Sequence, residues 1–210
     1  MNFLAHLYLA GDDQELIIGN FIADMVKGRQ IESYQDGVVR GIELHRKIDS
    51  FTDNHPIVDQ SKRRLRNRYR LYSGVIVDMF YDHYLARNWS EYSIQPLPRF
   101  VSHAYGLLLR NYFMLPVRAK NLLPFMIASN WLVNYSNLDK LKQHFQGLAK
   151  RTPFKSGMET AVEDLEQYYD EFGAEFATFF PDLIAYVERL GITHHHHFGK
   201  EEPTIARQFY

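Results

Sequence analysis

The spacing of the apolar residues constrains the fold of this chain more than any other feature. Apolar residues recur at intervals of three and four along most of the chain, and no segment sustains the alternation typical of a half-buried strand. We therefore predict an all-α fold. The expected helices are Asn2 to Ala10, Gln14 to Val26, Tyr34 to Phe51, Pro56 to Tyr72, Val75 to Arg87, Pro98 to Phe113, Pro116 to Tyr135, Leu138 to Leu148, and Gly157 to Leu190 with a break near Pro181.

The organisation of the chain favours a single domain. Of its 210 residues 46% are apolar, which suffices for a real core, and no repeat or linker rich in proline, glycine or serine divides it. We predict one helical domain over residues 1–193 and a loosely attached tail over 194–210. Four adjacent histidines in such a tail, His194 to His197, cannot converge on a defined site, so we assign them no function.

Composition excludes several classes of function. A chain without cysteine has no disulfide, thiolate nucleophile, iron–sulfur cluster or zinc finger. The N-terminal segment lacks the features of a signal peptide, and no apolar stretch reaches membrane-spanning length, so we expect a cytoplasmic protein without a membrane partner. The 24 Lys and Arg residues balance the 25 Asp and Glu residues, so any surface that binds a polyanion must be a local cluster.

Acidic and imidazole side chains stand inside several of the expected apolar helices. An ionised carboxylate buried alone costs several kcal/mol, so each needs a cation, a set of donors or a raised pKa. Where such residues occur in pairs, the spacing places both on one helix face. The residues are His6, Asn20 with Asp24, His45 with Asp49, and Asp78 with Asp82.

Two interpretations of these residues differ in the cation. The carboxylates either pair with Arg or Lys across the bundle, or they gather with the histidines around a divalent metal ion. Histidine recurs with the carboxylates, and the apolar stretches that contain Asp24 (17–26) and Asp78 (74–85) hold no Lys or Arg, which favours the metal. Oxygen and imidazole donors without sulfur suit Mn²⁺, Mg²⁺ or Fe²⁺, and less selectively Zn²⁺.

A run of bases from Lys62 to Arg70 stands out in a chain of balanced charge. Six bases occur in nine residues without an acid, and because they cannot all share one helix face, part of the run is solvated surface. Such a patch attracts an acidic macromolecule, either nucleic acid or an acidic protein. RNA or DNA stays a possible partner, because Tyr69 and Tyr72 could stack on bases. The docking candidates are Lys62, Arg63, Arg64, Arg66, Arg68 and Arg70.

Two other segments have purely structural interpretations. Residues 159–188 carry nine carboxylates and no base, and we interpret them as an outer amphipathic helix with solvated acids. Asp53 precedes Pro56, a proline suited to a first helical turn, and we interpret Asp53 as a helix cap.

Four stretches carry a family resemblance by their order and spacing. They are MNFLAHLYLA at 1–10, GNFIAD at 19–24, GIELHRKIDSFTDNHP at 41–56 and YSGVIVDMFYDH at 72–83, with a thinner match through Asn130-Trp131-Leu132 and Tyr135. Together they resemble the acyl carrier protein phosphodiesterase family, also called acyl carrier protein hydrolase. The resemblance implies a single-domain helical bundle distantly similar to the HD-type metal-dependent phosphohydrolases.

The same resemblance implies a reaction and a partner. The family hydrolyses the phosphodiester that joins 4′-phosphopantetheine to a serine of acyl carrier protein, giving the apo carrier, with a divalent metal, typically manganese. The adjacent His-Asp pair usual in HD enzymes is absent, and the nearest equivalents are His45 with Asp49 and the reversed Asp82-His83. Because the carrier is small and strongly acidic, the Lys62 to Arg70 run is expected to dock it, and nucleic acid becomes the less favoured partner.

The resemblance also distributes roles over the polar residues. The expected metal ligands are His6, Asp24, His45, Asp49, Asp78 and Asp82. Supporting contacts to the ligands are expected from Asn20, His55 and His83. The expected catalytic residues are Asp24, His45, Asp49, Asp78 and Arg46, the last as a positive charge near the bridging oxygen.

Two alternative functions stay open at this point. One is another HD-like metal phosphohydrolase that acts on nucleotides. The other is a non-enzymatic helical binding module whose buried acids are salt-bridged.

Overall fold

A computed structural model describes residues 2–193, and within them the regular secondary structure is entirely helical, which confirms the predicted all-α fold. The first residue and the expected tail 194–210, with its four histidines, lie outside the described residues. The α-helices are α1 (Phe3–Leu9), α2 (Gln14–Ile22), α3 (Asp36–Asn54), α4 (Pro56–Tyr69), α5 (Ser73–Arg87), α6 (Leu97–Arg110), α7 (Val117–Ala128), α8 (Trp131–Asn134), α9 (Leu138–Ala149), α10 (Ala161–Gln167) and α11 (Tyr169–Arg189). Short 3-10 helices are η1 (Ala23–Met25), η2 (Gly28–Ser33), η3 (Arg70–Tyr72), η4 (Trp89–Glu91), η5 (Tyr112–Met114) and η6 (Met158–Thr160).

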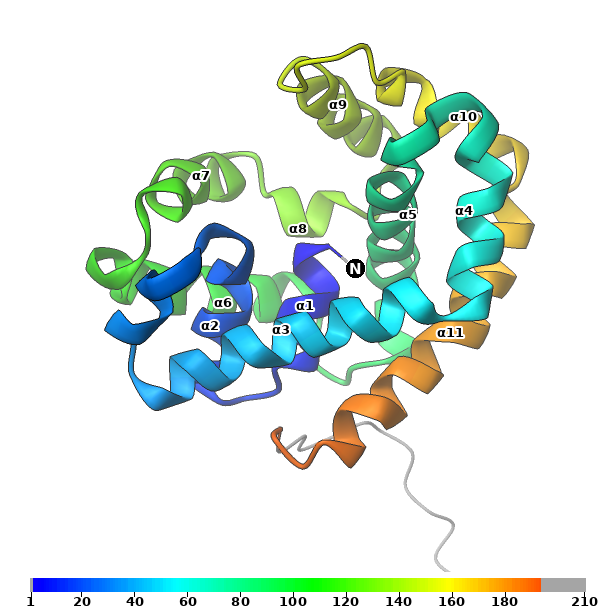
Figure 1. Cartoon of the computed structure of the whole chain (residues 1–210). Helices are drawn as coiled ribbons and strands as arrows, with labels where there is room; N and C mark the ends of the chain where they lie inside the picture. The colour runs from blue at the N-terminus through cyan, green and yellow to red at the C-terminus, as the bar shows by residue number, and fades with distance from the viewer. Residues whose placement is uncertain (1, 194–210) are drawn as a thin grey trace, which may run out of the picture.

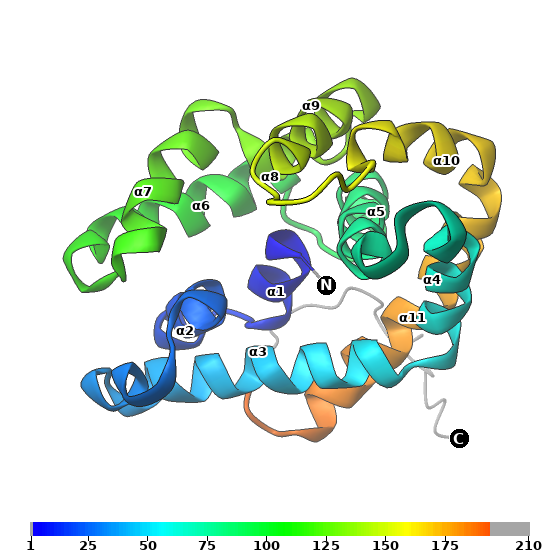
Figure 2. The same cartoon turned by 45° about the horizontal axis from the view of Figure 1, so that its top comes forward.

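The helices surround the short first helix. The long helix α3 runs past α1 and α2 and turns sharply into α4, which packs with α5 and α11 (Figures 1 and 2). Helix α1 packs against both α2 and α5, and every residue from Leu4 to Leu9 is buried. His6 therefore lies inside the molecule on an enclosed helix.

Helices α2 and α3 approach more closely than any side chain would allow at their crossing. A Cβ atom on Gly19 would lie 2.0 Å from the carbonyl oxygen of Val38, and one on Gly41 would lie 2.5 Å from the carbonyl oxygen of Leu16. Only glycine fits at both positions, because each would place its side chain in the backbone of the other helix. This contact sets Asn20, one residue after Gly19, against the turn of α3 that follows Gly41.

Two helix boundaries differ from the sequence-based expectation. The helix expected over Pro116 to Tyr135 is two helices, because Asn130 takes a left-handed conformation (φ 46°, ψ 45°) that asparagine tolerates better than most residues. The acidic segment divides at Tyr168, between α10 and α11, whereas Pro181 lies inside an unbroken α11. The predicted break near Pro181 is wrong.

At the corner between α3 and α4, the expected capping role of Asp53 is wrong. Pro56 is the first residue of α4, as expected, since its fixed φ suits that position. Asp53 does not cap α4: helix α3 continues through Asn54, and the Asp53 carboxylate accepts a hydrogen bond from Lys62 Nζ at 2.7 Å. No helix among residues 2–193 is both long enough and apolar enough to cross a membrane.

Candidate metal centre

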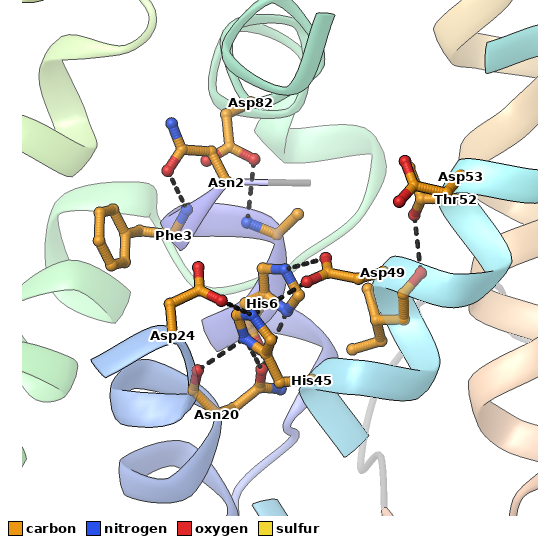
Figure 3. A network of polar contacts seen from close by, with 12 residues as sticks. Asn2, Phe3, His6, Asn20, Asp24, His45, Asp49, Thr52, Asp53 and Asp82 are labelled. Carbon is orange, nitrogen blue, oxygen red and sulfur yellow. Dashed lines mark hydrogen bonds and ion pairs between the residues drawn. The ribbon is translucent and has the colours of Figure 1, made fainter. Parts of the chain in front are cut away.

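Five polar side chains from separate segments meet where α1, α2 and α3 come together (Figure 3). His6 comes from α1, Asn20 from α2, Asp24 from η1, and His45 and Asp49 from successive turns of α3. The two imidazole rings stack with their centroids 3.8 Å apart and an angle of 15° between their planes. All five were expected from the sequence, and the structure brings them into one group.

Asn20 holds both imidazoles in one orientation. Its side-chain nitrogen donates to the carbonyl of His6 at 2.9 Å, so its Oδ1 is the atom that faces the rings. His6 Nδ1 lies 2.9 Å from this oxygen, and His45 Nδ1 lies 3.1 Å from it and 2.9 Å from the Asn20 carbonyl. Both oxygens can only accept, so each Nδ1 carries a proton and donates it. In the neutral rings, the free lone pair is therefore on Nε2.

The two Nε2 atoms face the carboxylates. His6 Nε2 lies 3.1 Å from Asp49 Oδ1, and His45 Nε2 lies 3.1 Å from Asp49 Oδ2 and 3.3 Å from Asp24 Oδ1. Within the described residues, His45 Nε2 is buried and makes no hydrogen bond of acceptable direction, although both carboxylates stand at ion-pair distance. Ligand atoms of His6, His45 and Asp49 all lie within 4.8 Å of one another.

The charges of these groups depend on one another. Burial, together with the charge on His45, lowers the pKa of His6 to about 4. Burial also opposes a charge on His45, but Asp24 and Asp49 outweigh it and raise the pKa of His45 to about 9. Although burial disfavours a charged Asp49, contacts with both histidines outweigh it and hold its pKa well below the usual range. Without another cation, the proton on His45 is what neutralises the carboxylates at neutral pH.

The donor set fits a divalent cation. His6 stays neutral and turns an Nε2 lone pair toward a carboxylate oxygen, an arrangement that is repulsive unless a cation lies between them. Both histidines are buried, whereas the side chains of Asp49 and Asp24 are 38% and 76% exposed, so the group opens to solvent on its carboxylate side. Two imidazole nitrogens fixed by an outer hydrogen bond and the Asp49 carboxylate converge, with the Asp24 carboxylate beside His45, and such nitrogen and oxygen donors without sulfur suit Mn²⁺ or Fe²⁺.

Comparison with known proteins identifies the family of this chain. Residues 1–183 match the family described as acyl carrier protein phosphodiesterase. The chain belongs to this family. A relative named acyl carrier protein phosphodiesterase from Photorhabdus laumondii subsp. laumondii is 35% identical over 189 residues, covering 90% of this chain and 96% of the relative. One of the same name from Escherichia coli strain K12 / DH10B is 35% identical over 193 residues, covering 91% of this chain and all of the relative.

Membership in the phosphodiesterase family confirms that the chain is an enzyme, a phosphoric diester hydrolase. No solved structure matches the chain. The expected likeness to HD-type phosphohydrolases therefore stays a prediction.

Two carboxylates expected as ligands from the resemblance to the phosphodiesterase family lie outside the group. Asp82 is fully buried and accepts hydrogen bonds from the backbone N–H groups of Leu4 at 2.8 Å and Ala5 at 3.2 Å. It thereby caps the first turn of α1, two residues before His6. Burial raises the pKa of Asp82 to about 7. Asp78 lies half-buried one turn earlier on α5, and its charge contributes to the raised pKa of Asp82.

Three other predicted residues are also placed elsewhere. His83 is buried in the core, where Nδ1 lies 2.8 Å from the Tyr135 carbonyl and Nε2 lies 2.9 Å from the Tyr169 hydroxyl. His55 pairs with Asp182 at 3.3 Å. Neither histidine supports the group around His45. Arg46 is exposed on α3, next to His45 in the chain.

The basic run on α4 is largely neutralised by acids of the same chain. Lys62 pairs with Asp53, and both Arg63 and Arg66 pair with Asp59. Arg68 lies 2.9 Å from Glu163 and 2.7 Å from Asp164, two acids of α10. Arg70, the sixth base, is exposed. The run therefore serves mainly to pack α4 against acidic neighbours, which weakens its expected role in docking a partner.

The remaining base of the run, Arg64, belongs to a buried cluster that the sequence interpretation missed. Glu175 on α11 is only 6% exposed, and it accepts hydrogen bonds from Arg64 Nη1 at 2.7 Å, from Gln60 Nε2 at 2.9 Å and from the Ser61 hydroxyl. The expectation that every acid of residues 159–188 is solvated is therefore wrong for Glu175. A signal was present in the sequence, because one acid-free basic run and one base-free acidic run are natural partners.

Proposed function

We propose that this chain is a metal-dependent phosphodiesterase that releases 4′-phosphopantetheine from holo acyl carrier protein and leaves the apo carrier. The main support is the convergence of two buried, equally oriented imidazole Nε2 atoms with two solvent-facing carboxylates. Relatives named for the same activity, which cover nine-tenths of the chain, give the substrate class. The reaction belongs to carrier turnover in fatty acid biosynthesis, in the cytoplasm.

The residues that would hold the cation are His6 and His45 through Nε2, together with Asp49 and Asp24. A divalent ion held there would supply positive charge for the non-bridging oxygens of the diester and make an attacking water more acidic. Manganese is the expected ion, because two imidazoles make the set less suited to Mg²⁺, which prefers oxygen donors; Fe²⁺ remains compatible with it.

The chain itself supplies orientation and proton transfer. Asn20 keeps both rings turned with Nε2 toward the substrate side, so no binding energy is needed to reorient them. Asp24 is the most exposed carboxylate of the group, and contact with His45 lowers its pKa, so it is ionised at neutral pH and able to accept the proton of the attacking water.

The leaving group needs a positive charge or a proton. Water oxygen bonds to phosphorus, the bond from phosphorus to the serine oxygen breaks, and that oxygen takes the proton that Asp24 accepted from the water, giving the serine hydroxyl. Arg46, exposed and next to His45 in the chain, is the positive charge we assign to this oxygen. Asp78 and Asp82 lie outside the group and have no step in this reaction; Asp82 acts by holding α1, and with it His6, in place.

The decisive experiment incubates purified protein with holo acyl carrier protein and Mn²⁺ and measures the carrier mass. We expect loss of phosphopantetheine in the presence of Mn²⁺ and no loss in EDTA. Isothermal titration of metal-free protein with Mn²⁺ gives a readout independent of activity. Turnover of nucleotides with an intact carrier would favour the nucleotide hydrolase, and a protein that neither binds Mn²⁺ nor cleaves the carrier would favour the binding module.

A further inference from the structure

A long stretch of this chain contains bases but no acid. Between Glu91 and Asp139 there are 47 residues without Asp or Glu. They form α6, η5, α7 and α8, of which α6 and α7 lie on the side of the molecule away from α4 and α11 (Figures 1 and 2). Their bases are Arg99, Arg110, Arg118 and Lys120. The Asp, Glu, Lys and Arg residues of this segment are therefore all basic, although the chain as a whole is almost neutral.

Helix α7 presents apolar side chains on its outer face as well as its inner one. Its inner face buries Ala119, Leu123 and Met126. On the outer face, Val117 is 72% exposed and Phe125 is 68% exposed. An amphipathic helix at a solvated surface normally carries polar groups there, and exposed apolar side chains that gather on one face mark an interaction site.

The segment before α7 extends this outer face. Phe113 on η5 is 91% exposed, and its carbonyl accepts a hydrogen bond from Lys120 Nζ at 2.9 Å. Pro124 has no N–H to offer the Lys120 carbonyl, and the Tyr112 hydroxyl donates to that carbonyl at 3.4 Å instead. Two contacts therefore hold η5 against α7, so that Phe113 is presented from a fixed platform.

The bases of this surface are available, in contrast to those of α4. Among the described residues, no ion pair involves Arg99, Arg110 or Arg118. Arg118 and Phe125 are seven residues apart on α7, so they lie on the same face two turns from each other. A positive charge beside an exposed aromatic ring suits a partner that offers carboxylates around an apolar patch.

The surface is continuous with the helices that carry the metal centre. Helix α6 packs on α2, which carries Asn20, and leads through η5 to α7. Trp131 on α8 meets Phe3 on α1 with ring centroids 6.4 Å apart, three residues before His6. A protein bound on α6 and α7 would thus sit beside the helices that position His6 and Asn20.

We propose that this surface, defined by Arg110, Phe113, Val117, Arg118 and Phe125, docks the acidic protein substrate. The proposal rests on the proposed function, which supplies an acidic carrier protein as the partner. It replaces α4 as the docking element, because the bases of α4 are occupied by acids of this chain.

The experiment measures binding of fluorescently labelled apo acyl carrier protein, which has no bond to cleave, by anisotropy. Arg118→Glu is compared with Lys142→Glu, the same charge change at an exposed lysine of α9, and with Arg66→Glu on α4. We expect Arg118→Glu to raise Kd on the order of tenfold at low salt and less at high salt, since the attraction is screened. Lys142→Glu and Arg66→Glu should leave Kd within about twofold. Phe125→Ser and Phe113→Ser test the apolar part and should weaken binding at all salt concentrations.

Each result decides between surfaces. Equal binding by Arg118→Glu, Phe125→Ser and wild type would overturn the proposal, and a loss confined to Arg66→Glu would return docking to α4. A dimer in sedimentation that Phe113→Ser and Phe125→Ser dissociate, or an oligonucleotide bound in place of the carrier, would also overturn it. If wild type binds the apo carrier through α7 but leaves the holo carrier intact, the proposed function fails and the docking surface stands. Circular dichroism of every variant checks folding.

Discussion

The molecule buries two clusters around carboxylates, and they differ in what neutralises the charge. In the cluster on α4 and α11, Glu175 has a guanidinium, an amide and a hydroxyl as partners, and all are supplied by the chain. Arg64 also lies 4.8 Å from the ring centre of Phe172, which packs its charged group against an aromatic face. This cluster is complete.

The cluster between α1, α2 and α3 is built from two histidines, one asparagine and two carboxylates. Its carboxylates face two imidazoles, of which one is neutral and the other is protonated only because Asp24 and Asp49 raise its pKa. The charge of His45 is a removable proton, whereas the charge of Arg64 cannot be removed. The comparison teaches that the identity of the cation, more than burial of the acid, separates a packing cluster from the candidate metal centre.

Removal of a carboxylate from the imidazole cluster tests this distinction with the largest expected effect. Asp49→Ala should abolish Mn²⁺ binding and carrier hydrolysis, a loss beyond the about 10–100-fold typical of residues that only support a ligand. Asp182→Ala is the matched control, since it removes the acid of another His–Asp pair, with His55. Calorimetry and carrier mass measure the two effects, and near-normal turnover by Asp49→Ala would refute the metal centre.

Removal of the carboxylate from the cluster of Glu175 and Arg64 should lower the stability of the fold. Glu175→Ala leaves the Arg64 charge partly buried without its acceptor, so we expect a loss of about 3–5 kcal/mol in the free energy of unfolding. Glu163→Ala removes a partner of the more exposed Arg68 and should cost less than about 1 kcal/mol. Urea denaturation measures both. Equal small losses would mean that Glu175 does not stabilise the packing of α4 on α11.

Sequence reasoning predicted the fold class correctly and selected the residues that the structure brings together around His45, for a physical reason. Polar side chains such as Asp24 and His45 are conspicuous in apolar helices, and helical spacing places His45 and Asp49 on one face. The same reasoning also selected Asp82. Spacing alone cannot distinguish a carboxylate that caps a distant helix from one that faces a metal. The backbone N–H of Leu4, which donates a hydrogen bond to Asp82, belongs to α1 and lies 78 residues earlier in the chain.

The basic run shows the other limit of a single sequence. Arg64 and Arg68 were interpreted without their partners, since Glu163, Asp164 and Glu175 lie about a hundred residues further along the chain. The partners of the other paired bases, Asp53 and Asp59, are close in the sequence. The α7 surface was hidden for the opposite reason. Its signal is a missing residue type, the absence of acids between Glu91 and Asp139, which stands out only after five bases of α4 are seen to be paired.

Asn20 allows a test of how much the orientation of the two imidazole rings contributes to metal binding. Asn20→Ala removes the acceptor for both Nδ1–H groups, so the rings are free to turn or change tautomer, and Mn²⁺ affinity should fall about 10–100-fold. Asn111→Ala is the control, because Asn111 also donates to a backbone carbonyl, that of Leu107, at 3.0 Å. Unchanged affinity by calorimetry in Asn20→Ala would show that the carboxylates alone orient the metal.

The last prediction concerns the pH dependence of stability in EDTA. Asp24 and Asp49 raise the pKa of His45 from 6.5 to about 9, so the folded protein holds this proton more tightly than the unfolded chain does. The resulting stabilisation is fully present below pH 6.5 and is lost as pH rises through 9, a fall of up to about 3 kcal/mol. The lowered pKa of His6 acts only below pH 6.5 and does not contribute to this fall. Urea denaturation of wild type and His45→Gln at pH 6.5 and 9 isolates the contribution of His45, because other titrating groups are common to both proteins. The variant should show the smaller fall, and equal falls would mean that His45 is not the cation that holds the two carboxylates together when no metal is present.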